Sequence, residues 1–429
     1  MKKLILILLA VFLTVPGWAD IYLYNASTTT WSGPYATYEL ARAGSDTGTL
    51  DAGDIVEYRA DTPGGSKTFT RAGAILPGSS DSGASGNPAI IRGRAGDTIT
   101  IDPTTAGYAL LNSASNTNYL KFQNLNFISG STSCLDYTGT STGLELVDVS
   151  TTGRVRIDNR SDLTITRLTI SGSTTGGFQS VGGNGVTGED ITIYNNSGAS
   201  YLCYINGKTT ASTLTNTVST YNSGEGLRVY GCETAIVGGE FAYNNSHGVA
   251  ITNSANDTTV AGAKIHHNIN PSGTLGSGVY ISDSTGVVVG GSPTNKNWVY
   301  SNEWDGVSYN GASTGGEVSY NEIYLNGKLG ESNSGDAVTG HGTSTGLVIK
   351  WNYIHDNLNT AYAFVGGAAG SIYHNKAVNN GTGGFNTRGA FYSTSTGAFV
   401  LRNNIFDLNE PYEIRVDATA AAVLDSDYN

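Results

Sequence analysis

Three oxygen-bearing residues occupy equivalent places in three similar segments. Ser277, Asp305 and Asp336 come directly before "GVYIS", "GVSYN" and "AVTGH". If those segments lie side by side, the two carboxylates approach to about 5 Å, and like charges that close need a proton or a cation between them. Ca²⁺ takes about six to eight oxygen ligands, so the spacing predicts Ca²⁺ at these three residues. The alternative is that an Asp before a small residue forms a turn and binds backbone N–H groups.

A second group of residues has the types that bind or act on sugars. Arg228 and Lys328 are cations, and His341, between two glycines, can donate or accept a proton. Aromatic rings can cover sugar C–H groups and amides can bind hydroxyls, which makes candidates of Tyr230, Tyr280, Trp304 and Asn310. The alternative is that these are ordinary residues of a β-surface and that His341 only decorates it.

The elements that position these residues come from repetition in the sequence. A small residue followed by an apolar pair recurs at intervals of 22 to 31 residues, in "GLRVYGCE" (226), "GVAITNS" (248), "GVYISDS" (278), "GVSYNGAS" (306), "AVTGHGTS" (337), "AYAFVGGA" (361) and "AFYSTST" (390). Less regular copies begin near residues 109, 134 and 154. Short alternating runs bounded by Gly, Asn and Ser indicate strands. Three strands per repeat, with no room for a helix, predict a coil in which each turn pairs in parallel with the next.

Asparagines recur in two registers in the second half of each repeat. Asn321, Asn352, Asn375 and Asn403 share one register, and Asn326, Asn357, Asn380 and Asn409 share the other. Asn tolerates left-handed dihedrals and binds local backbone at turns. Stacked amides also form hydrogen-bonded ladders, so we expect both sets to pile up along the coil.

Alternation along the first strand of each repeat separates inward from outward residues. Val249 and Ile251 should point inward, as should their counterparts in the following repeats. The outward residues then form three columns: Arg228, Ala250, Tyr280, Ser308 and Thr339; Tyr230, Thr252, Ser282, Asn310 and His341; and Glu225, His247, Ser277, Asp305 and Asp336. Loops 267–277, 291–305 and 327–335 flank these columns. We expect a solvent-exposed groove that suits an extended sugar chain.

The repeat resembles the right-handed parallel β-helix of the pectate-lyase-like superfamily, over about residues 88–429. The resemblance implies an all-β solenoid of about 12 three-strand coils. Segment 20–87 resembles the entry segment of such folds, and "YATYELARAG" (35–44) predicts a short N-terminal capping helix. The last residues, "AAVLDSDYN", resemble an interrupted coil, so we expect the natural chain to continue beyond Asn429.

The resemblance also implies chemistry. In calcium-dependent polysaccharide lyases of this superfamily, the metal neutralises a uronate carboxylate while a Lys or Arg removes the C5 proton. Lys328 and Arg228 match the base by residue type, and His341 would be a proton donor or sugar contact. In the polygalacturonase family a Gly-His-Gly segment accompanies an Asn-Thr-Asp triplet and an Asp-Asp pair; Gly340–Gly342 matches the first, but the other two are missing here. Inverting hydrolysis needs two carboxylates, so that family's mechanism is not expected.

The N-terminus and the charge bound the location and the partners. "MKKLILILLAVFLTVPGWA" predicts a signal peptide over residues 1–19, and hence a secreted or periplasmic protein with no membrane span. The full chain has a net charge of −12, and cleavage would leave 21 basic against 35 acidic residues. A surface this acidic repels nucleic acid. We expect a polysaccharide as the partner, and a monomer.

Three cysteines, Cys134, Cys203 and Cys232, cannot all pair within one chain. At least one is therefore a free thiol or bonds another chain. The alternative for each is a buried, apolar role.

The sequence as a whole favours an exported polysaccharide lyase that cleaves a uronate-containing glycan with the help of Ca²⁺. Two alternatives stay open: a non-catalytic, adhesin-like solenoid that binds glycans along its flat face, and a hydrolase of the polygalacturonase type. Ice binding is not favoured, because the "TIT" and "TST" triplets do not stack in one register.

Overall fold

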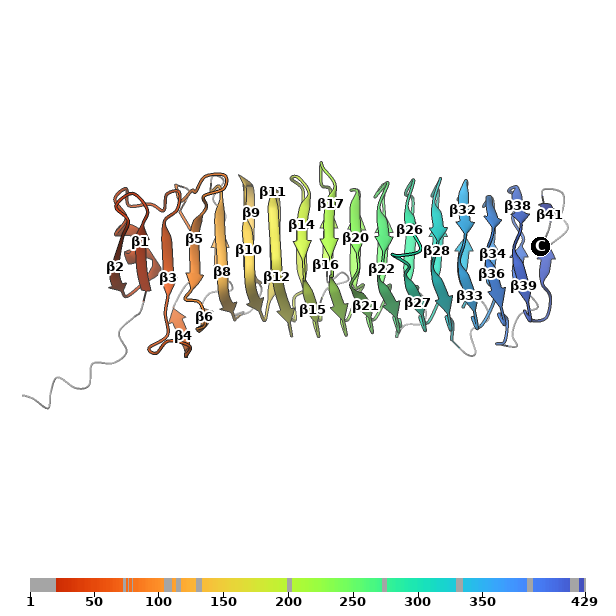
Figure 1. Cartoon of the computed structure of the whole chain (residues 1–429), viewed down its shortest axis with the longest axis horizontal. Coiled ribbons are helices and arrows are strands. Elements are labelled where there is room, and N and C mark those ends of the chain that lie inside the picture. The colour runs from red at the N-terminus through yellow and green to blue at the C-terminus, as the bar shows by residue number, and fades with distance from the viewer. Residues whose placement is uncertain are drawn as a thin grey trace, which may run out of the picture.

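The strands of this chain stand side by side along one long axis, with the N-terminal elements at one end and β41 at the other (Figure 1). The computed structural model describes residues 21–71, 75, 77–78, 80–103, 110–112, 117–128, 133–198, 203–271, 276–328, 335–383, 389–416 and 424–427. The predicted signal peptide, residues 1–19, lies outside these ranges, as do parts of loops 267–277 and 327–335, whereas loop 291–305 is described in full.

The first strand of every coil belongs to one parallel sheet of 13 strands within the described ranges. We call it the first-strand sheet; it contains β7 (Leu110–Asn112), β9 (Ser133–Thr142), β11 (Arg154–Ser161), β13 (Phe178–Val181), β16 (Cys203–Asn206), β19 (Leu227–Tyr230), β22 (Val249–Thr252), β25 (Val279–Ser282), β28 (Val307–Asn310), β31 (Val338–Gly340), β34 (Tyr362–Phe364), β37 (Phe391–Ser393) and β40 (Ile414–Val416). The sequence repeats missed β13, β16 and β40, whose segments "GFQSVGG", "CYINGK" and "EIRV" do not begin with a small residue followed by an apolar pair.

The second and third strands form two further parallel ladders, which share β8 (Leu120–Phe127), β10 (Glu145–Thr151) and β12 (Leu163–Ser171) and separate after β12. The second-strand ladder continues with β14 (Val186–Glu189), β17 (Ser212–Thr215), β20 (Thr234–Val237), β23 (Thr259–Ala261), β26 (Val288–Gly290), β29 (Glu317–Ser319), β32 (Leu347–Lys350), β35 (Gly370–Tyr373), β38 (Phe399–Arg402) and β41 (Leu424–Asp427). The third-strand ladder continues with β15 (Thr192–Tyr194), β18 (Val218–Thr220), β21 (Glu240–Ala242), β24 (Lys264–His266), β27 (Trp298–Tyr300), β30 (Glu322–Tyr324), β33 (Tyr353–His355), β36 (Lys376–Val378) and β39 (Ile405–Asp407).

The N-terminal segment differs from the coils because it contains antiparallel pairs. Here β1 (Ile21–Asn25) pairs antiparallel with β2 (Thr30–Tyr35) and with β3 (Ile55–Tyr58). Parallel pairing then begins through β4 (Ser66–Arg71), β5 (Ala89–Gly93) and β6 (Thr98–Pro103). The single described helix, α1 (Tyr38–Ala43), is shorter than the predicted 35–44 because Thr37 caps it, its Oγ1 accepting the Leu40 N–H at 3.2 Å.

The predicted inward residues form a continuous core. Val249, Ile251, Val279, Ile281, Val307 and Tyr309 are at most 1% exposed. The three cysteines are also buried and form no disulfide bond with one another, which confirms the predicted buried role. Burial raises the pKa of the Cys203 thiol to about 12. Among the described residues no helix combines the length and the hydropathy needed to cross a bilayer.

Two asparagine ladders close the corners of the coil, as predicted. In one, Nδ2 of each Asn donates to Oδ1 of the next at 2.9–3.2 Å, through Asn196, Asn222, Asn244, Asn268, Asn302, Asn326, Asn357, Asn380 and Asn409. The other runs through Asn297, Asn321, Asn352, Asn375 and Asn404. Asn403 was therefore assigned wrongly: it takes the left-handed position (φ 54°) directly before the ladder.

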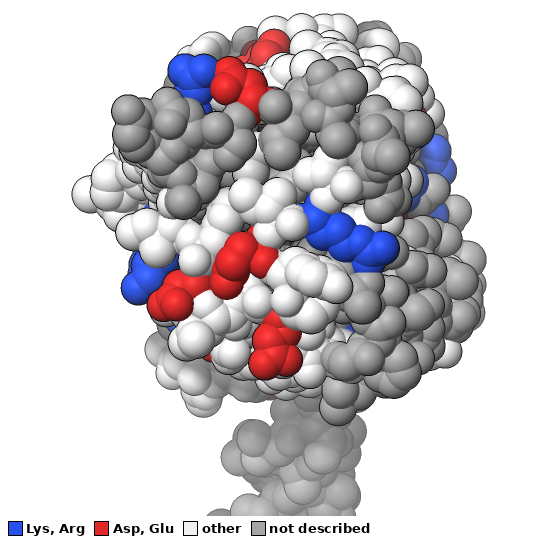
Figure 2. All heavy atoms as spheres, turned by 90° about the vertical axis from the view of Figure 1, so that its right-hand side faces the viewer, with Lys and Arg blue, Asp and Glu red and all other residues white. Residues whose placement is uncertain are grey.

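Figure 2 looks along the axis onto the C-terminal end. Basic and acidic side chains are interspersed on the part of this end that the structure describes. Arg402, for example, pairs with Asp425 at 2.6 Å. This end therefore shows no surface of a single charge sign within the described ranges.

Candidate functional site

The outer face of the first-strand sheet carries the three predicted columns. Strand register places Arg228 beside Ala250, Ala250 beside Tyr280, Tyr280 beside Ser308 and Ser308 beside Thr339. Backbone bonds from Gly226, Gly248, Gly278 and Gly306 to the carbonyls of His247, Ser277, Asp305 and Asp336 join the column that precedes the strands. The sequence predicted these neighbours correctly.

Exposure differs from the expectation of an open groove. The column that precedes the strands is buried throughout: Glu225, His247, Ser277, Asp305 and Asp336 are at most 5% exposed. Ala250, Ser308 and Thr339 are at most 3% exposed as well. Alternation predicts which side of a strand a residue occupies, but it does not show what covers that side. Half-buried Arg228, Tyr230, Tyr280 and Asn310 form the accessible part of this face.

Arg228 is held in place by a buried acid. Its Nε and Nη2 atoms donate to the two carboxylate oxygens of Glu225 at 2.7 and 2.6 Å. Burial raises the pKa of Glu225, and the guanidinium opposes that shift. Such a two-bond pair fixes the plane of the guanidinium. Arg228 is therefore an oriented cation, and its strong pairing argues against the predicted role as a base.

His247 lies one coil further along and was absent from the predicted site residues. Its Nδ1 accepts the Ser277 N–H at 3.3 Å, and its ring stacks on Tyr280 with centroids 4.4 Å apart. Burial, with a smaller contribution from Arg228, lowers its pKa to about 3. The ring is thus neutral at ordinary pH. It holds Tyr280 upright beside the space next to Arg228.

Asp305 and Asp336 lie on adjacent coils, as predicted, but their contacts favour the turn-former reading. Oδ1 of Asp305 accepts the Asp336 N–H at 3.3 Å, and Oδ1 of Asp336 accepts the Thr360 N–H at 2.9 Å. Hydroxyls donate to both carboxyls, from Thr339 at 3.1 Å and from Thr360. Burial and the neighbouring Asp336 raise the pKa of Asp305 well above its usual range. The raised pKa favours the protonated form of Asp305, which lowers the charge of this pair.

These contacts bear on the predicted calcium site. The oxygens of Asp305 and Asp336 face N–H and O–H donors, whereas a Ca²⁺ site offers oxygen lone pairs. Ser277 does place a buried hydroxyl without a hydrogen-bond partner in the same column. Burial of all three residues, however, does not fit an ion that must also touch a substrate carboxylate. Ca²⁺ binding here stays a prediction, which the cation dependence of an activity assay tests.

The remaining predicted residues lie along the same face. Nζ of Lys328 pairs with Oε1 of Glu303 at 2.6 Å, two residues before Asp305. Arg228 is three coils away from Asp305, about 14 Å at roughly 4.8 Å per coil, so this predicted base does not lie beside the acid pair. Half-buried His341 follows β31, and its backbone N–H donates to the Tyr309 carbonyl at 2.8 Å. The backbone N–H of half-buried Trp304 donates to the Gly276 carbonyl at 3.2 Å.

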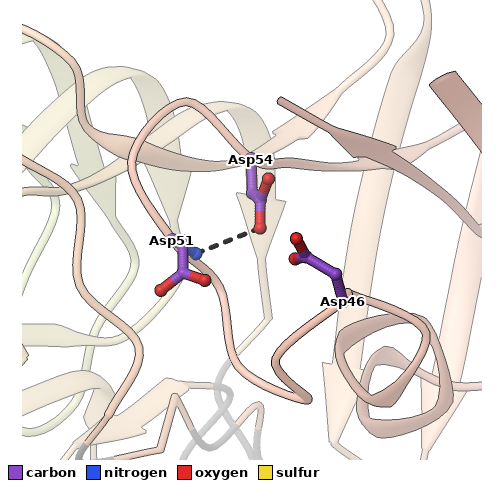
Figure 3. A group of neighbouring side chains, drawn as sticks. All are labelled: Asp46, Asp51 and Asp54. Atoms are coloured by element: carbon purple, nitrogen blue, oxygen red, sulfur yellow. Dashed lines mark hydrogen bonds between the residues drawn. The ribbon is translucent and has the colours of Figure 1, made fainter. Parts of the chain in front are cut away.

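A separate group of three carboxylates lies in the N-terminal segment (Figure 3). Ligand oxygens of Asp46, Asp51 and Asp54 lie within 4.8 Å of one another. Asp54 already accepts the N–H groups of Ala26 and Asp51, at 2.8 and 3.0 Å. These bonds tie β1 to the turn before β3, so the group has a structural role.

The chain is similar to one family model and to several solved structures. The family model described as right-handed β-helix region matches residues 203–345. The A-module of mannuronan C-5 epimerase AlgE4 from Azotobacter vinelandii is 12% identical, with a TM-score of 0.40, and the alignment covers 89% of this chain and 90% of that one. A mannuronic acid specific polysaccharide family 6 lyase from human gut microbiota is 12% identical (TM-score 0.31, 88% and 81% covered). PfbA, a surface adhesin of Streptococcus pneumoniae, is 10% identical (TM-score 0.37, 79% and 80% covered). No curated protein gives a significant match. Similarity at this level does not transfer an activity.

Proposed function

We propose that this right-handed parallel β-helix is an exported, carbohydrate-active protein that holds a uronate-containing polysaccharide along the outer face of its first-strand sheet. The observation that carries the proposal is the oriented cation Arg228, with Tyr280 two coils away and braced by neutral His247. Two coils span roughly 9.6 Å, and buried Ala250 lies between them. A carboxylate on one sugar can pair with Arg228 while the next ring lies beside Tyr280.

A polymer lying along the axis would reach further polar groups. Lys328, in its ion pair with Glu303, lies about three coils beyond Arg228, or about 14 Å. His341 follows β31, four coils beyond Arg228, or about 19 Å. Arg suits carboxylate recognition because its planar fork matches two oxygens. Local cations of this kind let an acidic protein hold an acidic glycan despite its net charge.

The reaction that fits these groups best is β-elimination. A base removes the C5 proton of a uronate, the C4–O bond breaks, a C4=C5 double bond forms, and an acid protonates the departing oxygen. Lys328 is the candidate base and His341 the candidate acid. To act, Lys328 must leave Glu303 and lose its proton, which a bound glycan carboxylate cannot promote by charge. Ca²⁺ would supply the missing positive charge if the predicted site binds it.

A direct assay tests this proposal. The protein is incubated with pectate, alginate or chondroitin, with and without Ca²⁺, and the ultraviolet absorbance of an unsaturated product is followed. Arg228→Gln should abolish binding and turnover, whereas Arg402→Gln, which removes a paired surface arginine from another sheet, should change neither. Turnover that survives Arg228→Gln would disprove the role of Arg228.

A glycan-binding solenoid without catalysis is the second candidate. Two observations favour this candidate. Lys328 is engaged in an ion pair with Glu303, and the carboxyl groups of Asp305 and Asp336 accept backbone N–H groups, so these contacts would have to break before proton transfer. Saturable glycan binding without product would establish this function. Product formation would exclude it.

A further inference from the structure

Two consecutive histidines meet side by side at a corner of the third-strand ladder. His266 is the last residue of β24, and His267 has a left-handed backbone with φ 52°. Consecutive residues of a strand point to opposite faces, but this backbone brings the two rings together. Their Nδ1 atoms are 2.9 Å apart.

Neighbouring groups hold both rings. Nε2 of His266 lies 3.0 Å from Oε1 of Glu240, and the His266 ring stacks on Tyr300 at 4.5 Å. The His267 ring stacks on Tyr243 at 4.8 Å. Glu240 is cross-strand from exposed Lys264, the other charge near the pair. The site is therefore built on rigid strands with each imidazole braced from a different coil.

Counting protons shows which nitrogen is free to bind. Neutral imidazole carries one N–H, and the carboxylate of Glu240 places it on Nε2 of His266. Nδ1 of His266 then carries a lone pair, and the contact between the two Nδ1 atoms requires the proton of His267 to lie on its Nδ1. A carboxylate that accepts the far N–H is also the usual partner of a metal-binding histidine.

We propose that the His266–His267 pair binds a divalent transition-metal ion, preferably Cu²⁺, through the two Nδ1 atoms, while the proton of His267 moves from its Nδ1 to its Nε2. With metal–nitrogen bonds of about 2.0–2.1 Å, a separation of 2.9 Å corresponds to a nitrogen–metal–nitrogen angle of about 90°. Tetragonal Cu²⁺ takes that angle, whereas tetrahedral Zn²⁺ needs the nitrogens about 3.3–3.4 Å apart. Cu²⁺ also leads the affinity order for nitrogen ligands.

Other coils show that this is a property of these two residues. The same two positions hold Tyr300 and Ser301 on the next coil and Tyr324 and Leu325 on the one after. The side chain of His266 is only 7% exposed, so solvent reaches the pair through half-buried His267. Water would complete the coordination, because Glu240 contacts the far nitrogen of His266 and the described residues place no third ligand atom of His, Cys, Asp or Glu within 4.8 Å of both Nδ1 atoms.

The test uses the untagged full chain, titrated with Cu²⁺ and followed by calorimetry and electron paramagnetic resonance. The wild type should bind one equivalent with two nitrogen ligands. His267→Asn, which keeps a residue suited to left-handed dihedrals, should weaken binding at least about 100-fold, and Glu240→Gln about 10-fold. His374→Asn is the matched control, because exposed His374 has the same backbone conformation (φ 58°) at the other corner.

The pH dependence gives an independent readout. When Cu²⁺ takes Nδ1 of a neutral imidazole, the ring carries its one proton on Nε2, so no net proton is released where both rings are neutral. An imidazolium must lose a proton before it binds, so the affinity should fall toward low pH, and proton release should appear only there in buffers of different ionisation enthalpy. Equal Cu²⁺ binding by wild type and His267→Asn would overturn the proposal, as would the absence of any saturable equivalent. In either case the two rings share a hydrogen bond only.

Discussion

Two corners of the same coil solve one structural problem with different chemistry. Between successive coils, each turn must satisfy backbone N–H groups that no strand partner reaches. At one corner a uniform asparagine does so: Oδ1 of Asn326 accepts the Asn302 N–H at 3.2 Å. In the column before the first strands, His247, Asp305 and Asp336 do the same for the next coil, at 2.9–3.3 Å.

The difference separates scaffold from candidate function. Amides are neutral, so a ladder of them can be buried without a proton or an ion. Carboxyls and imidazoles at the equivalent task shift their pKa values, as Glu225, His247 and Asp305 do. The need for an acceptor explains why these positions are polar but not why they are ionisable. Ionisable residues where an amide would serve are therefore the ones to examine for function.

Removing one ladder amide should have the largest effect on stability. Nδ2 of Asn380 donates to Asn409 at 2.9 Å, and its Oδ1 accepts from Asn357 N and Nδ2 at 3.1 and 2.9 Å. Asn380→Ala leaves several buried partners unsatisfied, at about 1–3 kcal/mol each. We expect the free energy of unfolding to fall by about 4 kcal/mol in denaturant titration.

The neighbouring residue supplies the control for that substitution. Asn379 is exposed and left-handed (φ 55°), and Asn379→Gly keeps a residue that accepts this conformation. Its effect should be below about 1 kcal/mol. Equal losses from the two variants would mean that the ladder does not carry the stability.

Acid should destabilise the other corner through His247. Its folded pKa of about 3 lies below the usual value of about 6.5, so the unfolded chain binds a proton first as the pH falls. Stability from this residue is complete above about pH 6.5 and declines by roughly 3 kcal/mol by pH 4. His247→Gln should remove most of that decline in thermal melts across this range. A wild type and a variant with the same acid profile would refute the burial argument.

Asp305 should give a smaller slope of opposite sign. Its folded pKa is raised by burial and by Asp336, so the folded chain binds the proton more tightly. Stability is complete below the usual Asp pKa and falls as the pH rises through the folded value. Asp305→Asn should flatten that fall, since an amide still accepts the Asp336 N–H.

A surface aspartate with the reverse shift is the control for Asp305. The N–H of Ala312, at 3.0 Å, holds the pKa of Asp283 below its usual range. In thermal melts at high pH, Asp283→Asn should therefore be less stable than the wild type, whereas Asp305→Asn should retain more stability than the wild type. Parallel pH profiles for the wild type and Asp305→Asn would show that the carboxyl carries no bound proton.

The repeat period predicted the fold because spacing fixes which residues become neighbours. The columns from Arg228 to Thr339 and from Glu225 to Asp336 follow from alternation alone, and the structure confirms them. The period failed where two asparagines are adjacent. Asn403 and Asn404 both suit a corner, and each is followed two residues later by an apolar residue, Ile405 or Phe406. The spacing of five residues between the two ladders, as from Asn375 to Asn380, identifies Asn404, which precedes Asn409 by five.

The candidate site was less predictable, because function depends on exposure and protonation. Sequence alternation placed Asp305 on the outer side of the coil, yet contacts from Thr339 and from the next coil bury it. It also placed His247 in the right column without indicating that its ring would stack on Tyr280. These outcomes depend on contacts between side chains of different coils, which a periodic pattern in the sequence does not encode.

Replacing Lys328 should have the smallest effect on stability. Its effect on product formation can therefore be assigned to chemistry and can separate the two proposed functions. The side chain of Lys328 is 52% exposed, whereas that of Glu303 is only 6% exposed, so water screens the Lys328 end of the ion pair and we expect the pair to contribute about 1 kcal/mol or less. Glu303 also accepts the Asn270 N–H at 2.6 Å, so it keeps a partner in Lys328→Gln. Unfolding should therefore shift by less than about 1 kcal/mol, as in Lys296→Gln, which breaks a similar pair with Glu322 at 2.8 Å. If Lys328 is the base, product formation falls by at least about 100-fold in Lys328→Gln alone, while glycan binding persists because Arg228 is intact. Undiminished turnover in Lys328→Gln would remove Lys328 from the mechanism and show that the base is another residue.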